Sequence, residues 1–227
     1  MAGALPGNLA AVLLAGGEGR RLGGTDKARL RRGAKTLLQH WVAALEKRGI
    51  PVAVVGPAHL RAELPQDALL TREDPPLGGP AAAARAGLLA LEKEGLPADP
   101  EGWVLLLAVD VVEPGTLLDW LCAELEQAEP EQVGLAESGQ AGPEQPGGQA
   151  VIPQDATGRL QHLASAVPAR PLMERARSLS GEAADGRPLR ILLEGIPARH
   201  PQMPPALGAD VDTPEDARRL GVRLQMP

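Results

Sequence analysis

The chain alternates short runs of apolar residues with longer segments in which apolar residues recur at helical spacing. Continuous apolar runs are typical of parallel strands buried on both faces. We predict such strands at 9–15, 51–55 and 103–109, with weaker candidates at 133–136 and 149–152. The segments between them carry helix start and stop signals, namely a capping threonine, prolines in the first turn and glycines after the last turn. The predicted helices begin after Thr36, at Pro80 and at Pro114, and end before Gly49, before Gly95 and near Ala128.

This order of elements predicts an α/β fold, with a mainly parallel sheet covered by helices on both faces. A length of 227 residues suits one three-layer domain that spans residues 1–227. Residues 1–8 and the Gly/Gln/Pro-rich segment 139–148 are expected to be flexible. Ligands of such sheets bind beyond the carboxyl ends of the strands.

The segment after the first predicted strand is suited to binding phosphate. Glycines at 16, 17, 19, 23 and 24 allow backbone N–H groups to approach an anion, and Arg20, Arg21 and Lys27 add positive charge. It is not a P-loop, because the lysine comes too late, and it is not a dinucleotide fingerprint, because Leu22 stands at the third glycine position. A glycine-rich turn with solvated arginines is the alternative, but five glycines with three cations favour a nucleotide ligand.

Charge is concentrated in the same region. Residues 16–35 carry seven Lys/Arg and two Asp/Glu, a local charge of +5 in a chain of net charge −6. The net negative charge of the rest of the chain argues against nucleic acid and anionic membranes as partners, whereas a local positive patch suits a small polyphosphate. The lone Cys122 excludes an internal disulfide and a cysteine zinc site, and it indicates a reducing cytoplasm, where it is expected to be a small core residue. The chain has no Phe or Tyr on which a base could stack.

Several acidic residues lie where a metal ion or an anion could bind. Asp110 directly follows a buried strand, so it could hold Mg²⁺ on nucleotide phosphates or could only cap a turn, and both interpretations stay open. Near the carboxyl end, Thr213 to Asp216 are explained as a helix start, whereas Asp210 and Asp212 remain and would lie on one side of an extended segment. Asp74 precedes a Pro/Gly-rich turn at a helix start, which is either a second anion site or an ordinary tight loop.

The segment Leu14-Ala-Gly-Gly-Glu-Gly-Arg-Arg-Leu-Gly-Gly-Thr-Asp-Lys27 resembles the signature loop of the molybdenum cofactor guanylyltransferases. That loop reads Leu-Ala-Gly-Gly, a spacer, then Arg-Met/Leu-Gly-Gly-x-Asp-Lys. Related sugar and cytidylyl enzymes usually have Leu-Ala-Ala-Gly and lack the Gly-Gly-x-Asp-Lys ending. Three later segments resemble family motifs in the same order, namely Asp74 with 76–80, Asp110, and 212–216.

The resemblance implies a Rossmann-like nucleotidyltransferase fold and a Mg²⁺-dependent enzyme of the cytoplasm. Such an enzyme moves GMP from GTP to the phosphate of a molybdopterin acceptor, releases pyrophosphate and contacts other proteins of the cofactor pathway transiently. We assign Asp110 to the metal and Arg21 and Lys27 to the phosphates. The remaining nucleotide-binding candidates are Leu14, Ala15, Gly16, Gly17, Gly19, Asp74 and Gly79, with Arg20 as a weaker one.

The chain departs from the family pattern at three places. Val109, Val111 and Val112 replace the usual Cys and Pro-Phe around Asp110, Gly56 stands where the family often has Asn, and Asp212 replaces an Asn. Cytidylyl relatives more often carry Asp-x-Asp-Thr-Pro-Glu-Asp, so transfer from CTP, or to another small phosphorylated acceptor, stays open. A non-catalytic nucleotide- or pterin-binding subunit is the alternative of a different class.

Overall fold

The computed structural model describes residues 8–17, 22, 24–66, 68–99, 101–128 and 148–224. Gly19, Arg20 and Arg21 of the glycine-rich loop lie outside these residues. So do the strand predicted at 133–136 and most of the two segments predicted to be flexible, 1–7 and 139–147.

The described residues form a mixed seven-stranded sheet, in which four of the six strand pairs are parallel. Its strands in spatial order are β5 (Leu69–Thr71), β4 (Val52–Val55), β1 (Leu9–Leu14), β6 (Trp103–Ala108), β8 (Ala164–Pro168), β7 (Ala150–Val151) and β9 (Ala198–Arg199). The parallel block β5-β4-β1-β6 contains the three strongly predicted strands. The antiparallel strand β8 beside β6 was not predicted.

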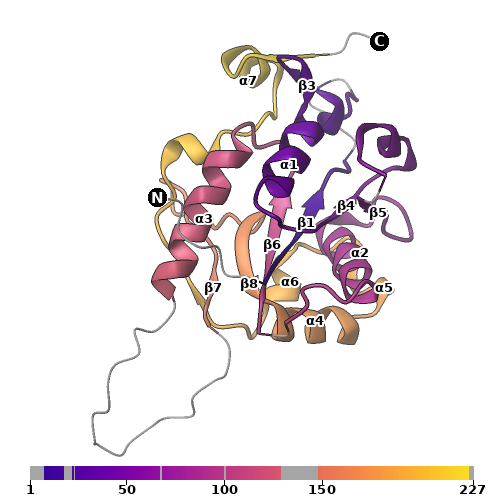
Figure 1. Cartoon of the computed structure of the whole chain (residues 1–227), viewed down its shortest axis with the longest axis vertical. Coiled ribbons are helices and arrows are strands. Elements are labelled where there is room, and N and C mark those ends of the chain that lie inside the picture. Colours follow the sequence, from indigo (N-terminus) through magenta and orange to yellow (C-terminus); the bar gives the residue numbers. More distant parts are fainter. Residues whose placement is uncertain are drawn as a thin grey trace, which may run out of the picture.

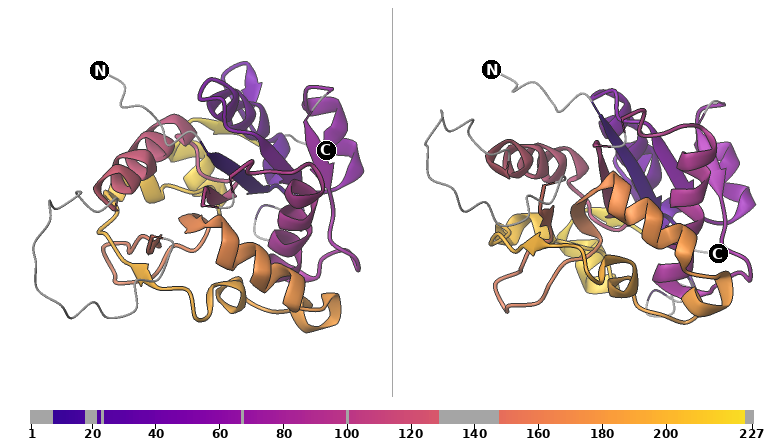
Figure 2. Two further views of the ribbon diagram at one scale, coloured as in Figure 1. Left: turned by 60° about the horizontal axis from the view of Figure 1, so that its bottom comes forward. Right: turned by 90° about the horizontal axis from the view of Figure 1, so that it is seen from below.

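Helices cover both faces of this sheet, which confirms the predicted three layers (Figures 1 and 2). One face is covered by α1 (Leu37–Glu46) and α3 (Pro114–Ala128), and the other by α2 (Gly79–Lys93), α4 (Ala169–Ser178) and α6 (Arg190–Leu193), with α5 (Gly181–Ala184) beside α2. Along β1, Ala11 and Leu13 pack on the α1 face, whereas Val12 and Leu14 pack on the α2 face. Because both faces are buried, the strands read as continuous apolar runs.

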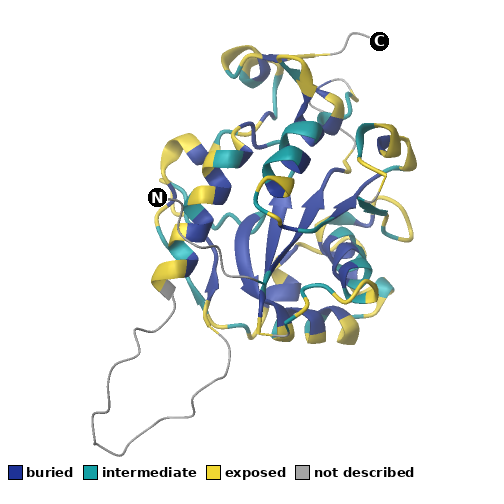
Figure 3. Cartoon of the chain, in the orientation of Figure 1, coloured by how far each residue is buried: buried dark blue, intermediate teal, exposed yellow. Residues whose placement is uncertain are grey.

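The sheet is buried along its centre, as Figure 3 shows. Helix α2 lies close against it, since a Cβ atom added to Gly87 would lie 2.5 Å from Cγ1 of Val12. Cys122 is buried in the core, as predicted, and burial raises the pKa of its thiol to about 11. Among the described residues, no helix is both long enough and apolar enough to cross a bilayer.

The predicted helix signals act as expected. Thr36 and Gln39 form a capping box at the start of α1, and Gly49 and Gly95 adopt positive φ angles of 65° and 69° just beyond α1 and α2. Helices α1, α2 and α3 each start and end within a few residues of the predicted positions.

A small second sheet brings the carboxyl-terminal segment back to the residues that follow the glycine-rich loop. Its strands are β10 (Val222–Arg223), β2 (Arg31–Arg32) and β3 (Lys35–Thr36), and β10 pairs with β2. The chain reaches it through the 3₁₀ helix η4 (Pro205–Gly208) and through α7 (Pro214–Arg219), which contacts β10 and lies at the top of Figure 1. Residues near 210 are therefore held close to residues near 27, although the two segments are far apart in the sequence.

Candidate active site

The site lies where the strand order reverses. From β1 the chain passes through α1 to β4 on one side, and from β5 it passes through α2 to β6 on the other side of β1. Strands β1 and β6 are parallel and paired from Leu9 and Trp103 to Leu14 and Ala108, so their carboxyl ends are adjacent. Open α/β sheets bind ligands in the crevice at such a point.

A cavity of about 560 Å³ opens at this position. Its lining comes from the ends of β1, β4 and β6, the start of α2, and segments before β8 and α7. The lining residues are Leu14, Ala15, Gly16, Gly17, Leu22, Lys27, Val55, Glu73, Leu77, Gly79, Pro80, Ala83, Ala108, Val109, Asp110, Leu163 and Asp212. The volume is in the range of small-molecule pockets.

The described start of the glycine-rich loop forms one wall of the cavity. Gly17 has φ of 140°, a conformation that strains any residue with a side chain, and both Gly16 and Gly17 are exposed. Next to this wall, a Cβ atom at Gly56 would lie 2.8 Å from Cδ1 of Leu60 and 3.3 Å from the carbonyl carbon of Ala15. A side chain at position 56, such as the family's asparagine, would therefore require Leu60 and the backbone at Ala15 to shift.

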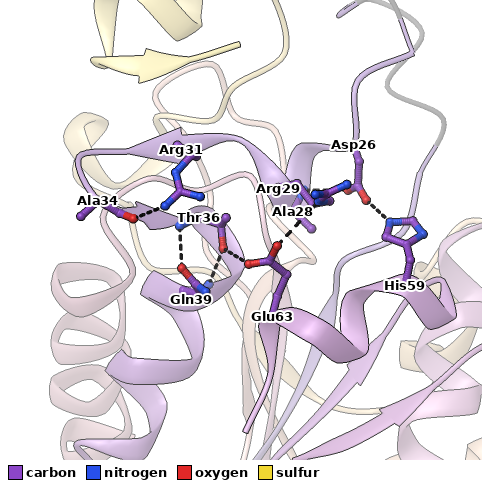
Figure 4. A network of polar contacts seen from close by, with 9 residues as sticks. All are labelled: Asp26, Ala28, Arg29, Arg31, Ala34, Thr36, Gln39, His59 and Glu63. Carbon is purple, nitrogen blue, oxygen red and sulfur yellow. Dashed lines mark hydrogen bonds and ion pairs between the residues drawn. The ribbon is translucent and has the colours of Figure 1, made fainter. Parts of the chain in front are cut away.

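Lys27 begins a short 3₁₀ helix, η2 (Lys27–Arg29), that is fixed from two sides. Asp26 caps it, because its Oδ1 accepts a hydrogen bond from the Ala28 N–H at 3.0 Å while its Oδ2 pairs with Nε2 of His59 at 2.7 Å. Arg29 pairs with Glu63 at 3.7 Å. His59 and Glu63 both belong to the 3₁₀ helix η3 (Ala58–Glu63), so η3 holds the backbone on both sides of Lys27 (Figure 4).

Asp110 is fixed by the chain that follows β6. The carbonyl of the next residue, Val111, accepts a hydrogen bond from Nε1 of the buried Trp41 at 3.1 Å. The segment also pairs antiparallel with the tail, since Val211 N–H donates to the Asp110 carbonyl at 3.2 Å. Val211 is fully buried, and Asp210 and Asp212 on either side of it turn their carboxylates toward Asp110.

These contacts assemble a charged cluster. Carboxylate oxygens of Asp110, Asp210 and Asp212 all lie within 4.8 Å of one another. The Lys27 ammonium donates to Oδ2 of Asp110 at 2.8 Å and to Oδ1 of Asp212 at 2.5 Å. Three carboxylate donors at this spacing fit Mg²⁺, which prefers oxygen ligands.

The electrostatics of the cluster shift two pKa values. Desolvation lowers the pKa of Lys27, but the charges and hydrogen bonds of Asp110 and Asp212 outweigh it, and the net shift is upward. Partial desolvation raises the pKa of Asp210, and the neighbouring charges of Asp110 and Asp212 raise it further. The lysine is thus held as a cation, and a further positive charge would stabilise the ionised carboxylates around it.

The turn before α2 forms the opposite wall. Leu77 has φ of 67° and is 57% exposed, and its N–H donates to Oε1 of Glu73 at 2.9 Å. Gly79 has φ of 82°, and the Ala81 N–H in the first turn donates to the Arg187 carbonyl at 3.3 Å. One backbone donor of this helix start is therefore already paired within the protein.

The structure brings most of the predicted site residues to one cavity. Those that line it are Leu14, Ala15, Gly16, Gly17, Lys27, Gly79 and Asp110. Asp74 is exposed and is not among the lining residues, whereas its neighbour Glu73 is. The sequence did not point to Glu73, Leu77 or Leu163. It also left Asp212 without a role, although the alternation of Asp210 and Asp212 placed both on one side of an extended segment. Gly19, Arg20 and Arg21 lie outside the described residues.

Comparison with known proteins agrees with the resemblance seen in the sequence. Over 105 residues, 45% of this chain and 48% of the relative, the chain is 40% identical to a protein of Opitutus terrae named probable molybdenum cofactor guanylyltransferase. The match thus spans about half the length of that curated relative.

Solved structures share the fold along nearly the whole chain. A homologue of Mycobacterium tuberculosis Rv0371c from Mycobacterium sp. strain JC1 superposes with a TM-score of 0.62 at 20% identity and covers 95% of this chain and 96% of its own. The 2-C-methyl-D-erythritol 4-phosphate cytidylyltransferase of Thermus thermophilus superposes with a TM-score of 0.57 at 17% identity and covers 94% and 97%. At these identities the likeness establishes the fold alone.

The model of one family, the MobA-like NTP transferase domain, matches residues 11–194. This match runs from β1 through the turn before α2 and the Asp110 segment to the end of α6. Since it covers most of the chain, and the predicted resemblance is confirmed, the chain belongs to the family of MobA-like NTP transferase domains.

Proposed function

We propose that this chain transfers GMP from GTP to the phosphate of a molybdopterin acceptor and releases pyrophosphate, with Mg²⁺ as cofactor. The observation that carries the proposal is the cluster of Lys27, Asp110 and Asp212 at the end of a cavity whose wall is a glycine-rich loop. The guanine and molybdopterin assignments rest on the signature loop and on the name of the Opitutus terrae relative.

In this reaction an oxygen of the acceptor phosphate attacks the α-phosphorus of the nucleotide. The bond from that phosphorus to the bridging oxygen of the β-phosphate breaks, and pyrophosphate leaves with the electron pair. Such chemistry depends on positioning and on charge neutralisation rather than on a protein nucleophile.

Named groups of the chain provide these two functions. The N–H groups of the exposed Gly16–Gly17 wall contact phosphate oxygens, and Lys27 neutralises their charge. Asp110, with Asp210 and Asp212, would hold Mg²⁺. When bound, the ion supplies charge neutralisation on the phosphates. Arg21 is proposed to add a second cation from the loop.

The cavity extends on both sides of the Gly16–Gly17 wall. On the β4 and α2 side it is lined by Val55, Leu77 and Ala83, with Glu73 as the acceptor of hydrogen bonds. On the β8 side Leu163 lines it. We propose that the two sides hold the nucleoside and the acceptor, which must meet at the α-phosphate. Aliphatic side chains line both sides, and the chain has no Phe or Tyr that could stack on a base.

Cytidylyl transfer is the second candidate, and Asp212 favours it, because this aspartate stands where guanylyl enzymes usually carry Asn and it contacts Lys27. We propose a cytoplasmic enzyme with no nucleic-acid or membrane partner, which meets other proteins of the cofactor pathway transiently. The acidic net charge of −6 and the single cysteine support this setting.

Two measurements test the function. Thermal unfolding with GTP, CTP, ATP and UTP, each with and without Mg²⁺, identifies the nucleotide, because selective binding raises apparent stability by mass action. Pyrophosphate release with molybdopterin then identifies the reaction. Release with GTP but not with CTP supports the proposal. Release with CTP but not with GTP replaces it by cytidylyl transfer. Stabilisation by GTP without any release indicates the non-catalytic binding subunit.

A further inference from the structure

Lys27 already contacts two of the carboxylates that a metal ion would need as ligands. Its ammonium group lies 2.8 Å from Asp110 and 2.5 Å from Asp212, two of the three carboxylates that fit a divalent cation. An ammonium group and a metal ion seek the same oxygen lone pairs. The metal ion would compete for carboxylates that already accept hydrogen bonds from Lys27, and the positive charges of the two cations repel at that separation.

We propose that the Lys27 ammonium is the resident counter-ion of the Asp110, Asp210 and Asp212 carboxylates, and that a divalent metal ion binds there by displacing it. The inference rests on the proposed function in one respect, namely that the displaced ammonium moves to the phosphates of a bound nucleotide. Binding of the metal ion and movement of the Lys27 ammonium to the substrate are then coupled.

Charge balance explains why a resident cation is needed. The three carboxylates together carry three negative charges when ionised, two of them on partly buried side chains, and clustered like charges destabilise a fold unless a cation compensates them. Lys27 supplies one positive charge from a side chain that is 24% exposed. A divalent ion compensates the cluster better than the ammonium does, and it therefore frees the lysine without leaving the carboxylates uncompensated.

The local structure allows the side chain to move while the backbone stays fixed. Asp26 caps the helix that Lys27 begins, and His59 and Glu63 hold Asp26 and Arg29 on either side. The lysine stem is a flexible four-carbon chain, and the side chain also lines the cavity beside the glycine-rich wall. Rotation about its own torsions would turn the ammonium away from the carboxylates and into the cavity that this wall also lines.

The coupling has a thermodynamic consequence. Without nucleotide, the metal must break the contacts of Lys27 and gains less than it would at a free site. With nucleotide, the phosphates accept the released ammonium, so metal and nucleotide should each increase the affinity of the protein for the other.

The first test measures metal affinity in the absence of nucleotide. Mn²⁺ serves as the probe, and its binding is followed by electron paramagnetic resonance for the wild type, Lys27→Met and Arg29→Met. Methionine keeps the length of the lysine stem without its charge. Lys27→Met should bind Mn²⁺ about tenfold more tightly than the wild type, because no charged hydrogen bonds have to be broken. Arg29→Met removes one charge from the same helix and should leave the affinity near that of the wild type.

The second test needs no variant, so it holds even if Lys27→Met folds poorly. Acetic anhydride labelling followed by mass spectrometry compares Lys27 with the exposed Lys35 in the wild type. Addition of Mg²⁺ should speed acetylation of Lys27 by about threefold, because its ion pairs are lost, and should leave Lys35 unchanged.

The outcomes separate this proposal from the proposed function. Equal or weaker Mn²⁺ binding by Lys27→Met, no detectable Mn²⁺ binding by any of the three proteins, or unchanged labelling of Lys27 would each overturn the exchange, although nucleotidyl transfer could still be observed. Tighter binding by Lys27→Met and faster labelling support it, even if neither GTP nor CTP yields pyrophosphate.

Discussion

The two ends of the cavity are built in different ways. The charged end consists of Lys27, Asp110 and Asp212, with Asp210 beside them in the same carboxylate cluster, and these residues come from three distant parts of the sequence. The apolar end consists of Val55, Leu77, Pro80 and Ala83, which come from β4 and from one turn and the helix that follows it. In the proposed reaction, the charged end, which tertiary contacts assemble, would act on the reacting phosphates, and the apolar end, which is local in the sequence, would act on affinity. Substitutions at the two ends should therefore affect different kinetic constants.

The largest effect is expected for Asp110→Asn at the charged end. The amide keeps the shape of the side chain and removes the charge that holds the ion, so pyrophosphate release should fall by about 100-fold or more. Mg²⁺-dependent stabilisation by GTP should be lost with it, while some metal-free binding remains. The measurement is pyrophosphate release as a function of Mg²⁺ concentration for both proteins.

A capping role for Asp110 predicts a different result. Asparagine caps a turn about as well as aspartate does. Release curves for the two proteins that superimpose would therefore remove Asp110 from the metal site, and GTP binding with no release from either protein would favour the non-catalytic binding subunit.

The next effect should come from Lys27→Ala, with Arg29→Ala as its matched control on η2. Lys27 is directed at the carboxylate cluster, whereas Arg29 is directed at Glu63 on the surface of η3. We expect Lys27→Ala to lower turnover by about 30-fold through lost charge at the phosphates, and Arg29→Ala to lower it by less than about threefold. With Mg²⁺ present to compensate the three carboxylates in place of the lost ammonium, both variants should unfold close to the wild-type temperature. Equal activities of the two variants would show that Lys27 is outside the reacting centre.

The sequence predicts the central layer of the fold because its signals are local. The continuous apolar runs of β1, β4 and β6 and the caps of α1 and α2 depend on residues within a few positions of one another. Strand β8 has no such signal, because Ala164–Pro168 has Val167 as its one large apolar residue, contains Ser165 and ends in proline. It becomes a strand through its pairing with β6, which is a tertiary contact.

The predicted residues of the site likewise have local signals in the sequence, whereas the unpredicted ones are placed by tertiary contacts. Asp110 and Lys27 are found from their positions after a strand and within a motif. The contact of Lys27 with Asp212 depends on the two-residue pairing of β10 with β2 and on the bridge of Val111 with Asp210, which leave no pattern in the sequence. The choice between Glu73 and Asp74 depends on the turn that lets Glu73 accept the Leu77 N–H.

At the apolar end, Leu77→Gly should reduce affinity without reducing turnover. A leucine at φ of 67° is strained by about 1–2 kcal/mol, and glycine would relieve this strain at an entropic cost of similar size. The unfolding free energy should therefore change by less than about 1 kcal/mol, while loss of an exposed apolar contact raises KM for the nucleotide or the acceptor by about fivefold. Leu224→Gly, at the other large exposed apolar residue of the described chain, is the control and should leave both KM values unchanged. An unchanged KM for both substrates in Leu77→Gly would contradict a role of this end in binding.

The smallest effect is expected for Asp216→Asn in α7, which follows the carboxylates of the charged end by only a few residues. Asp216 accepts hydrogen bonds from the Thr213 side chain at 2.7 Å and from Arg219 at 2.8 Å, and these contacts lower its pKa from 3.8 to about 2. A carboxyl group whose pKa is lower in the folded state than in the unfolded state stabilises the fold above the unfolded value and loses this contribution as the pH falls through the folded value. The wild type should therefore be slightly more stable than Asp216→Asn in urea at pH 6, and the difference should shrink as the pH falls from about 4 toward about 2. Because asparagine can still accept the capping hydrogen bonds, the variant isolates the charge of Asp216, and pyrophosphate release at pH 7 should stay near that of the wild type. A difference in stability that is equal at pH 6 and pH 3 would mean that α7 is held by its hydrogen bonds alone, and a large loss of release would mean that the charged end depends on the charge of this cap as well as on its own four residues.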